Sequence, residues 1–128
     1  MKYIVDSWAW VEYLIGSDYG EQAKQIIENK ENEIFTCVLS IAEIMSMTKR
    51  ENRDSDSAYN FITSLSKIYD VNNELSKNAG FLHAEIRKTI KDFGLVDAFV
   101  LAISRELKAK ILTGDKHFKS FKEAVLIC

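Results

Sequence analysis

The sequence contains no proline, and it has only two cysteines and two histidines among 128 residues. Without proline, glycine and polar helix caps must separate the segments of the chain. The cysteines, Cys37 and Cys128, show neither metal spacing nor a disulfide framework, so we expect both to be reduced thiols. The histidines, His83 and His117, are too few and too far apart in the chain to compete for zinc. We expect His83 to be a packed or surface helix residue, and His117 at most to support a metal ligand or contact a substrate.

Other signals are also absent. No apolar run approaches the roughly 20 residues of a membrane span, and the N-terminus is charged too early for a signal peptide, so we expect a soluble, cytoplasmic protein. No glycine-rich phosphate loop and no Gly-x-Ser-x-Gly motif occurs. The composition is that of an ordinary globular protein, with 47% hydrophobic and 28% charged residues. At this length we expect one domain over residues 1–128.

The net charge of −2 hides an asymmetry. Residues 1–66 hold 6 Lys/Arg and 11 Asp/Glu, whereas residues 67–128 hold 11 and 8. A basic half allows a polyanionic partner, although a run of charge is more often only a solvated face.

Short β-branched runs alternate with helical patterns along the chain. Strands are predicted at about 3–5, 34–38, 68–71, 111–113 and 125–127, and helices at about 7–15, 17–29, 40–50, 56–65, 72–93 and 97–108. Gly94 is expected to end the fifth helix. Strands of near-continuous apolar character separated by helices indicate an α/β fold with a mostly parallel sheet covered on both faces.

Four carboxylates stand where strands end or helices begin. Asp6 ends the first strand, Glu43 falls in the first turn after the second, Asp97 opens the last helix and Asp115 follows the fourth strand. In open parallel sheets, ligands bind beyond the carboxyl ends of the strands. The pattern therefore allows all four carboxylates to converge at one edge of the sheet.

Each carboxylate also has a purely structural explanation. Asp6 is a good helix cap, and Glu43 can close a capping box with Ser40. Asp97 can interact with the helix dipole, and Asp115 can form an Asx turn. Against this, Asp97 interrupts an apolar run, where a charge is costly unless the position is special.

Four carboxylates in one pocket repel one another and would either be protonated or bind a cation. Mg²⁺ or Mn²⁺ is the natural partner, because these ions prefer oxygen ligands and keep waters that can attack phosphorus. Asp6, Glu43, Asp97 and Asp115 are therefore the predicted metal ligands and catalytic residues.

These segments resemble a PIN domain, and in particular the small toxin ribonucleases of VapBC toxin–antitoxin pairs. The resemblance rests on residues 4–17, 40–43, 94–98 and 112–118, which read IVDSWAWVEYLIGS, SIAE, GLVDA and LTGDKHF. It implies a three-layer α/β/α sandwich with a five-stranded parallel sheet in the order 3-2-1-4-5. It also implies divalent-metal-dependent cleavage of RNA by an endoribonuclease, a homodimer, and an antitoxin protein that covers the active-site groove.

The resemblance extends to single residues. Asp6, Glu43 and Asp97 match the family's acidic triad, and Asp115 matches its more variable fourth acid. Ser7 and Thr113 occupy positions where the family often has a hydroxyl. If the antitoxin covers the groove, Phe118, Trp8 and Trp10 would have a partner-facing alternative to core packing. Basic residues that are candidates for holding the RNA backbone are Arg105, Lys108, Lys110, Lys116 and Lys119.

Two other hypotheses remain open on the sequence. One is a catalytically silent PIN-like binding module, which keeps the fold but binds no metal. The other is a receiver-type signalling domain with Asp70 as phosphoacceptor. The receiver hypothesis requires a pair of acids after the first strand, and here Asp6 is followed by Ser7.

Overall fold

The computed structural model describes residues 1–127, and Cys128 lies outside the described residues. They form a sheet in which every strand pairing is parallel and the strand order is β3-β2-β1-β4-β5. The strands are β1 (Lys2–Val5), β2 (Glu33–Cys37), β3 (Lys67–Tyr69), β4 (Lys110–Thr113) and β5 (Ala124–Leu126). The sequence-based prediction of an α/β fold with strand order 3-2-1-4-5 is therefore confirmed.

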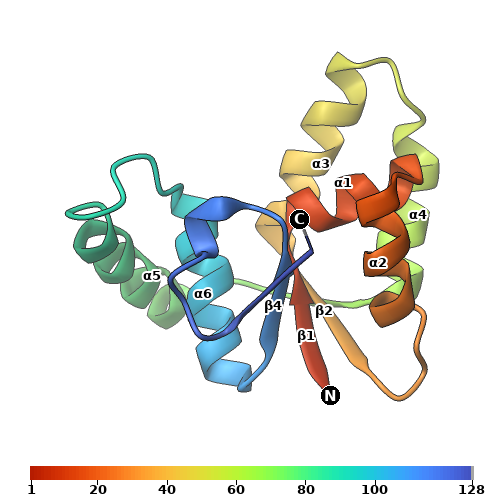
Figure 1. Ribbon diagram of the computed structural model, residues 1–128. Helices are drawn as coiled ribbons and strands as arrows, with labels where there is room; N and C mark the ends of the chain where they lie inside the picture. The colour runs from red at the N-terminus through yellow and green to blue at the C-terminus, as the bar shows by residue number, and fades with distance from the viewer. Residues whose placement is uncertain (128) are drawn as a thin grey trace.

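Helices cover both faces of the sheet (Figure 1). They are α1 (Ser7–Ile15), α2 (Asp18–Ile27), α3 (Val38–Arg50), α4 (Ser55–Leu65), α5 (Asn73–Ile86) and α6 (Leu95–Leu107), followed by the short 3₁₀ helix η1 (Lys116–Phe118). Helices α5 and α6 lie on one side of the strands, and α1 to α4 lie on the other.

The alternation of side chains along the strands explains the two layers of helices. Successive residues of a strand point to opposite faces. Ile4 and Ile111 accordingly join the core under α5 and α6, whereas their neighbours Val5 and Leu112 join the core under α1 to α4. All four side chains are fully buried, which is why the strands read as continuous apolar runs.

Four of the α-helices begin at a polar residue that caps them, and Asp6 was predicted as such a cap. The side chains of Asp6, Ser17, Asp54 and Asn72 each accept a hydrogen bond from a backbone N–H in the first turn of the helix that follows. These polar caps mark the starts of helices in a chain that has no proline.

Two predicted helix boundaries are wrong. Helix α3 begins at Val38, two residues early, so Ser40 lies inside the helix and cannot form a capping box with Glu43. Helix α5 ends at Ile86 rather than near residue 93, and Gly94 is the N-cap of α6 rather than a helix stop. The chain leaves α5 early because Phe93 is fully buried beside the ring of Phe118, with 5.6 Å between the ring centroids.

Most of the aromatic residues that were considered for contact with an antitoxin are packed in the core. Trp10 and Phe118 are fully buried, and the indole N–H of Trp10 donates to Oγ1 of Thr36 at 3.0 Å. Trp8 is half-buried. Cys37 is a buried free thiol. No helix within residues 1–127 is long and apolar enough to cross a membrane.

Candidate metal centre

Asp6 lies at the carboxyl end of β1 and is only 4% exposed. Its Oδ1 accepts a hydrogen bond from the backbone N–H of Ala9 at 2.9 Å, and its Oδ2 accepts one from the hydroxyl of Thr113 on the neighbouring strand β4. Burial raises the pKa of Asp6 to about 7, and the charges of Asp97 and Asp115 add to this rise against the lowering effect of the two hydrogen bonds. The ionised form of Asp6 is therefore destabilised by its surroundings, and a bound cation would stabilise it.

Asp97 lies in the first turn of α6, where it interacts with the helix terminus. Its Oδ2 accepts a hydrogen bond from the backbone N–H of Gly94 at 3.0 Å. Burial raises the pKa of Asp97, and the charge of Asp115 raises it further. The capping explanation is thus correct for one oxygen of this carboxylate. The other oxygen has no hydrogen-bond partner among the described residues.

Glu43 lies in the second turn of α3, not in the first turn as predicted. Burial raises its pKa, and repulsion from Asp97 adds to the rise, whereas a hydrogen bond with the Ser7 side chain opposes it. Glu43 and Asp115 both line a groove of about 300 Å³ between α1 and α3. The carboxylate of Glu43 therefore faces the same space as Asp115.

Asp115 forms the predicted Asx turn at the start of η1. Its Oδ1 accepts a hydrogen bond from the backbone N–H of His117 at 2.9 Å and lies 2.7 Å from Nδ1 of the same residue. The other ring nitrogen, Nε2, lies 2.9 Å from Oδ2 of Asp92. Contact with these carboxylates, first of all Asp92, raises the pKa of His117.

Potential ligand atoms of Asp97, Asp115 and His117 all lie within 4.8 Å of one another. Asp6 and Glu43 are outside this group, but the charge of Asp97 raises the pKa of both. Repulsion from Asp97 thus acts on Asp6 and Glu43, and Asp97 and Asp115 repel each other. Mutual repulsion of this kind and a set of mainly oxygen donors suit a divalent cation such as Mg²⁺ or Mn²⁺.

The signal in the sequence was weak for His117 and absent for Asp92. The signal for His117 was its spacing of two residues from Asp115, because an Asx turn brings the two side chains together. Asp92 lies in the connection between α5 and α6 and had no comparable signal. His83 packs as expected, with its Nε2 hydrogen-bonded to the carbonyl oxygen of Phe93 at 3.0 Å.

The predicted RNA-binding residues divide into two groups. Arg105 and Lys108 lie at the C-terminal end of α6, and Lys110 begins β4, so all three are at the end of the sheet opposite the carboxylates. Lys116 and Lys119 follow β4 on the same side as the carboxylates, in and next to η1.

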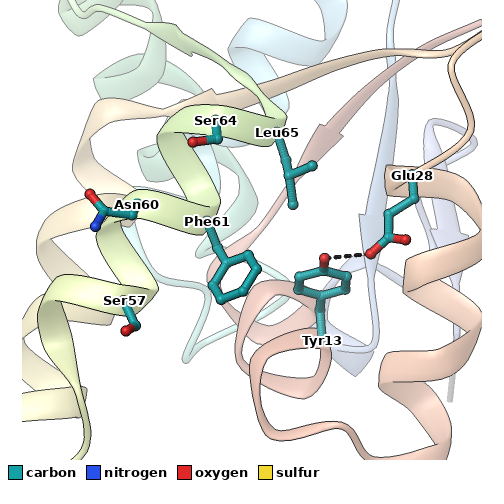
Figure 2. Close-up of a pocket in the computed structure, with 7 residues that line it drawn as sticks. All are labelled: Tyr13, Glu28, Ser57, Asn60, Phe61, Ser64 and Leu65. Atoms are coloured by element: carbon teal, nitrogen blue, oxygen red, sulfur yellow. Dashed lines mark hydrogen bonds between the residues drawn. The ribbon is translucent and has the colours of Figure 1, made fainter.

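A second hollow, of about 400 Å³, lies apart from the carboxylates (Figure 2). Phe61 and Leu65 of α4 point toward the ring of Tyr13 on α1, and the Tyr13 hydroxyl donates to Oε2 of Glu28 at 2.6 Å. This hollow is mainly apolar and offers no cluster of ligands.

A protein-family model described as the PIN domain matches residues 3–124. No curated protein matches the sequence significantly. Among solved structures, the chain is similar to a toxin–antitoxin complex from Klebsiella pneumoniae, with a TM-score of 0.74 and 18% identity over 98% of each chain. It is also similar to VapC20 of Mycobacterium tuberculosis, described as a sarcin–ricin loop cleaving toxin, with a TM-score of 0.75 and 18% identity over 94% of this chain and 95% of that one. A third is VapBC2 from Rickettsia felis bound to a DNA fragment from their promoter, with a TM-score of 0.72 and 19% identity over 98% and 97% of the chains. At these identities the likeness shows the fold.

Proposed function

The chain belongs to the PIN domain family, and from this premise we propose that it is a metal-dependent endoribonuclease that hydrolyses RNA phosphodiesters. The observation that carries the proposal is the convergence of Asp97, Asp115 and His117 within 4.8 Å, next to a buried Asp6 whose pKa is raised to about 7. Buried acids with shifted pKa values are typical of functional sites. We further propose that residues 1–128 act as a single nuclease domain.

Asp6, Glu43, Asp97 and Asp115 are the proposed holders of Mg²⁺ or Mn²⁺. Such an ion, when bound, would neutralise charge on the phosphodiester and activate water for attack. The hydroxyl of Thr113 orients Asp6, and the backbone N–H of Gly94 orients Asp97. The protein therefore contributes a fixed arrangement of carboxylates, which would hold the ion in one place relative to a substrate phosphate.

Cleavage of structured RNA, with and without chelator, tests this function. A hairpin with a sarcin–ricin loop sequence is a suitable first substrate, because one structurally similar protein is described as cleaving that loop. We expect cleavage with Mn²⁺ or Mg²⁺, none with chelator, and a loss of at least 100-fold for Asp97→Asn. Chelator-insensitive cleavage, or equal cleavage by the variant, would overturn the mechanism.

A catalytically silent binding module with the same fold is the alternative. It predicts no affinity for metal, whereas the nuclease predicts one. Calorimetric titration of Mn²⁺ into the wild type and into Asp97→Asn separates the two, because only the nuclease predicts heat that the substitution abolishes.

The proposed biological role is that of a cytoplasmic toxin held inactive by an antitoxin protein. The support is the similarity to chains from toxin–antitoxin complexes, together with a path of hollows that leads to the carboxylates. Phe61 lines both the hollow of Figure 2 and a neighbouring hollow between α1, α3 and α4. That neighbouring hollow shares Val11 and Met47 with the carboxylate groove. A partner with an apolar helix could follow this path to the carboxylates.

Co-expression with the protein encoded by an adjacent upstream reading frame tests the antitoxin partner. Phe61 is 51% exposed, and we expect Phe61→Glu to abolish co-purification. Phe81→Glu is the matched control, because Phe81 is 66% exposed but lies on α5, on the other face of the sheet. Equal co-purification of both variants would contradict this surface. Light scattering on the isolated chain tests the proposed homodimer.

A further inference from the structure

The connection between α5 and α6 carries a concentration of positive charge. Arg87, Lys88 and Lys91 are all exposed. Lys88 pairs with Glu85 at 3.0 Å, whereas Arg87 and Lys91 have no ion-pair partner within residues 1–127. Two cations at this position are therefore available to an external anion.

The same connection is fastened to the candidate metal centre at two points, through Asp92 and Gly94, and to α5 at a third point, through His83. Oδ2 of Asp92 lies 2.9 Å from Nε2 of His117, and the carbonyl oxygen of Phe93 is bonded to His83 at 3.0 Å. The N–H of Gly94 donates to Asp97. Phe93 of this connection is fully buried, whereas the side chain of Asp92 is 80% exposed, so the contact between Asp92 and His117 ties the exposed part of the connection to the carboxylates.

The opposite wall of the site has the opposite charge. The groove between α1 and α3 is lined by Glu12 in addition to the proposed metal ligands Glu43 and Asp115, and by no Lys or Arg. A polyanion approaching the carboxylates is therefore repelled by this wall. The side formed by residues 87–94 and η1 offers cations instead, because Lys116 and Lys119 are exposed there as well.

We propose that Arg87, Lys88, Lys91, Lys116 and Lys119 form a basic edge that binds the phosphodiester backbone of the substrate beside the carboxylates. His117 is a positioning residue that holds this edge in place through Asp92. The inference rests on the proposed function, since it names the surface by which the same site takes its RNA.

RNA binding in chelator tests the basic edge without cleavage. We compare Arg87→Gln/Lys91→Gln with the control Lys2→Gln/Lys30→Gln, whose lysines lie near the amino ends of β1 and β2. For a labelled single-stranded RNA followed by fluorescence anisotropy, each phosphate contact contributes about 0.7 to the slope of log affinity against log salt. For the edge variant, the magnitude of the slope should therefore fall by about 1.4, and the affinity at low salt should fall on the order of tenfold. For the control variant, neither the slope nor the affinity should change.

An unchanged slope for the edge variant, or an equal change in the control, would overturn the inference. So would a wild type that binds no RNA. Cleavage by the wild type with Mn²⁺ is measured in parallel, so that the two proposals can fail separately. If the wild type cleaves RNA but the slope of the edge variant is unchanged, the proposed function is supported and the basic edge is refuted. If binding depends on the edge but no cleavage occurs, the basic edge is supported and the proposed function is refuted.

Asp92→Ala tests the role of His117, because the loss of a negative charge and the loss of the contact with His117 should change RNA affinity in opposite directions. Removing a carboxylate from a phosphate-binding surface strengthens binding if only charge matters. Releasing the loop from His117 weakens it. We expect Asp92→Ala to weaken RNA binding and to raise KM with little change in kcat, whereas the control Glu85→Ala, which contacts Lys88 and not His117, binds as tightly as the wild type or more tightly. Tighter binding by both variants would overturn the positioning role.

Discussion

The hydroxyl of Thr113 donates a hydrogen bond to Oδ2 of Asp6, joining the ends of two adjacent parallel strands. The same Oγ1 accepts a hydrogen bond from the backbone N–H of Asp115 at 3.0 Å. One buried hydroxyl therefore fixes the relative positions of two of the carboxylates that are proposed to bind metal.

Replacing this hydroxyl should alter both stability and metal binding. The hydrogen bond lowers the pKa of Asp6, so Thr113→Val raises that pKa further and makes the proton a stronger competitor of the metal. We expect weaker Mn²⁺ binding at neutral pH and recovery at higher pH in calorimetric titrations. We also expect a loss of about 1–3 kcal/mol in the free energy of unfolding. Thr113→Ser keeps the hydroxyl and should resemble the wild type. If Ser and Val behaved alike, the hydroxyl would have no role in positioning Asp6.

The stability of the metal-free protein should fall as the pH rises from about 4 to 7. The folded-state pKa of Asp6 is about 7, against an ordinary value of 3.8 in the unfolded chain, so in this interval the folded state binds more protons than the unfolded state. The contribution of Asp6 to the free energy of unfolding is therefore fully present below pH 3.8. It is lost as the pH rises toward 7, and the loss is roughly 4 kcal/mol. Glu43 and Asp97, whose pKa values are also raised, act in the same direction.

Urea unfolding in chelator at several pH values measures this loss. Asp6→Asn should flatten the dependence, because it removes the titrating group and keeps an acceptor for the N–H of Ala9. Saturating Mn²⁺ should restore stability at neutral pH in the wild type, by about 2.7 kcal/mol at 100 times Kd. A stability that rises with pH in this interval would contradict the assigned burial of Asp6.

The helix cap and the proposed metal binding of Asp97 can be examined with two substitutions. Asn keeps an oxygen that can accept from Gly94, whereas Ala removes both the charge and the cap. We expect both variants to lose Mn²⁺ affinity, and Asp97→Asn to be more stable than Asp97→Ala by about 1 kcal/mol, the typical value of a helix cap. At pH 8 in chelator, Asp97→Asn should be at least as stable as the wild type, because it removes a half-buried charge that is repelled by Asp115. Retained Mn²⁺ affinity in either variant would exclude Asp97 as a ligand.

Much of this site was accessible from the sequence because it depends on local rules. Asp6 and Asp115 follow strands, and Asp97 lies in the first turn of a helix; parallel strands bring such positions to one edge. The strand order came from the resemblance to PIN domains, since the local patterns specify strands but not which strands are neighbours.

What the sequence did not predict depends on contacts between distant segments. The apolar spacing of Ile86 and Ile90 continues the helical pattern of α5, yet the chain turns after Ile86 because Phe93 must reach the core. The contact between Asp92 and His117 is a result of that turn. Val38 and Leu39 are equally compatible with the end of a strand and the start of a helix, which is why the start of α3, and with it the turn that holds Glu43, was misplaced.

Gly114, in the segment between Thr113 and Asp115, lies against the ring of Trp8. A Cβ atom at this position would come within 2.2 to 2.6 Å of three carbon atoms of the ring. Gly114→Ala should therefore displace Trp8, which lines the carboxylate groove, and lower the free energy of unfolding by about 1–3 kcal/mol.

The matched control for this substitution is Gly80→Ala in α5, where a Cβ would meet no atom within 4 Å. Because alanine is the better helix former, this control should gain about 0.5–1 kcal/mol. Urea unfolding gives both values, and tryptophan fluorescence should change only for Gly114→Ala, since Trp10 is fully buried elsewhere in the core. A Gly114→Ala variant with wild-type stability and fluorescence would show that the ring of Trp8 yields without cost, and the segment 113–115 would then be less firmly packed than the contact with Trp8 indicates.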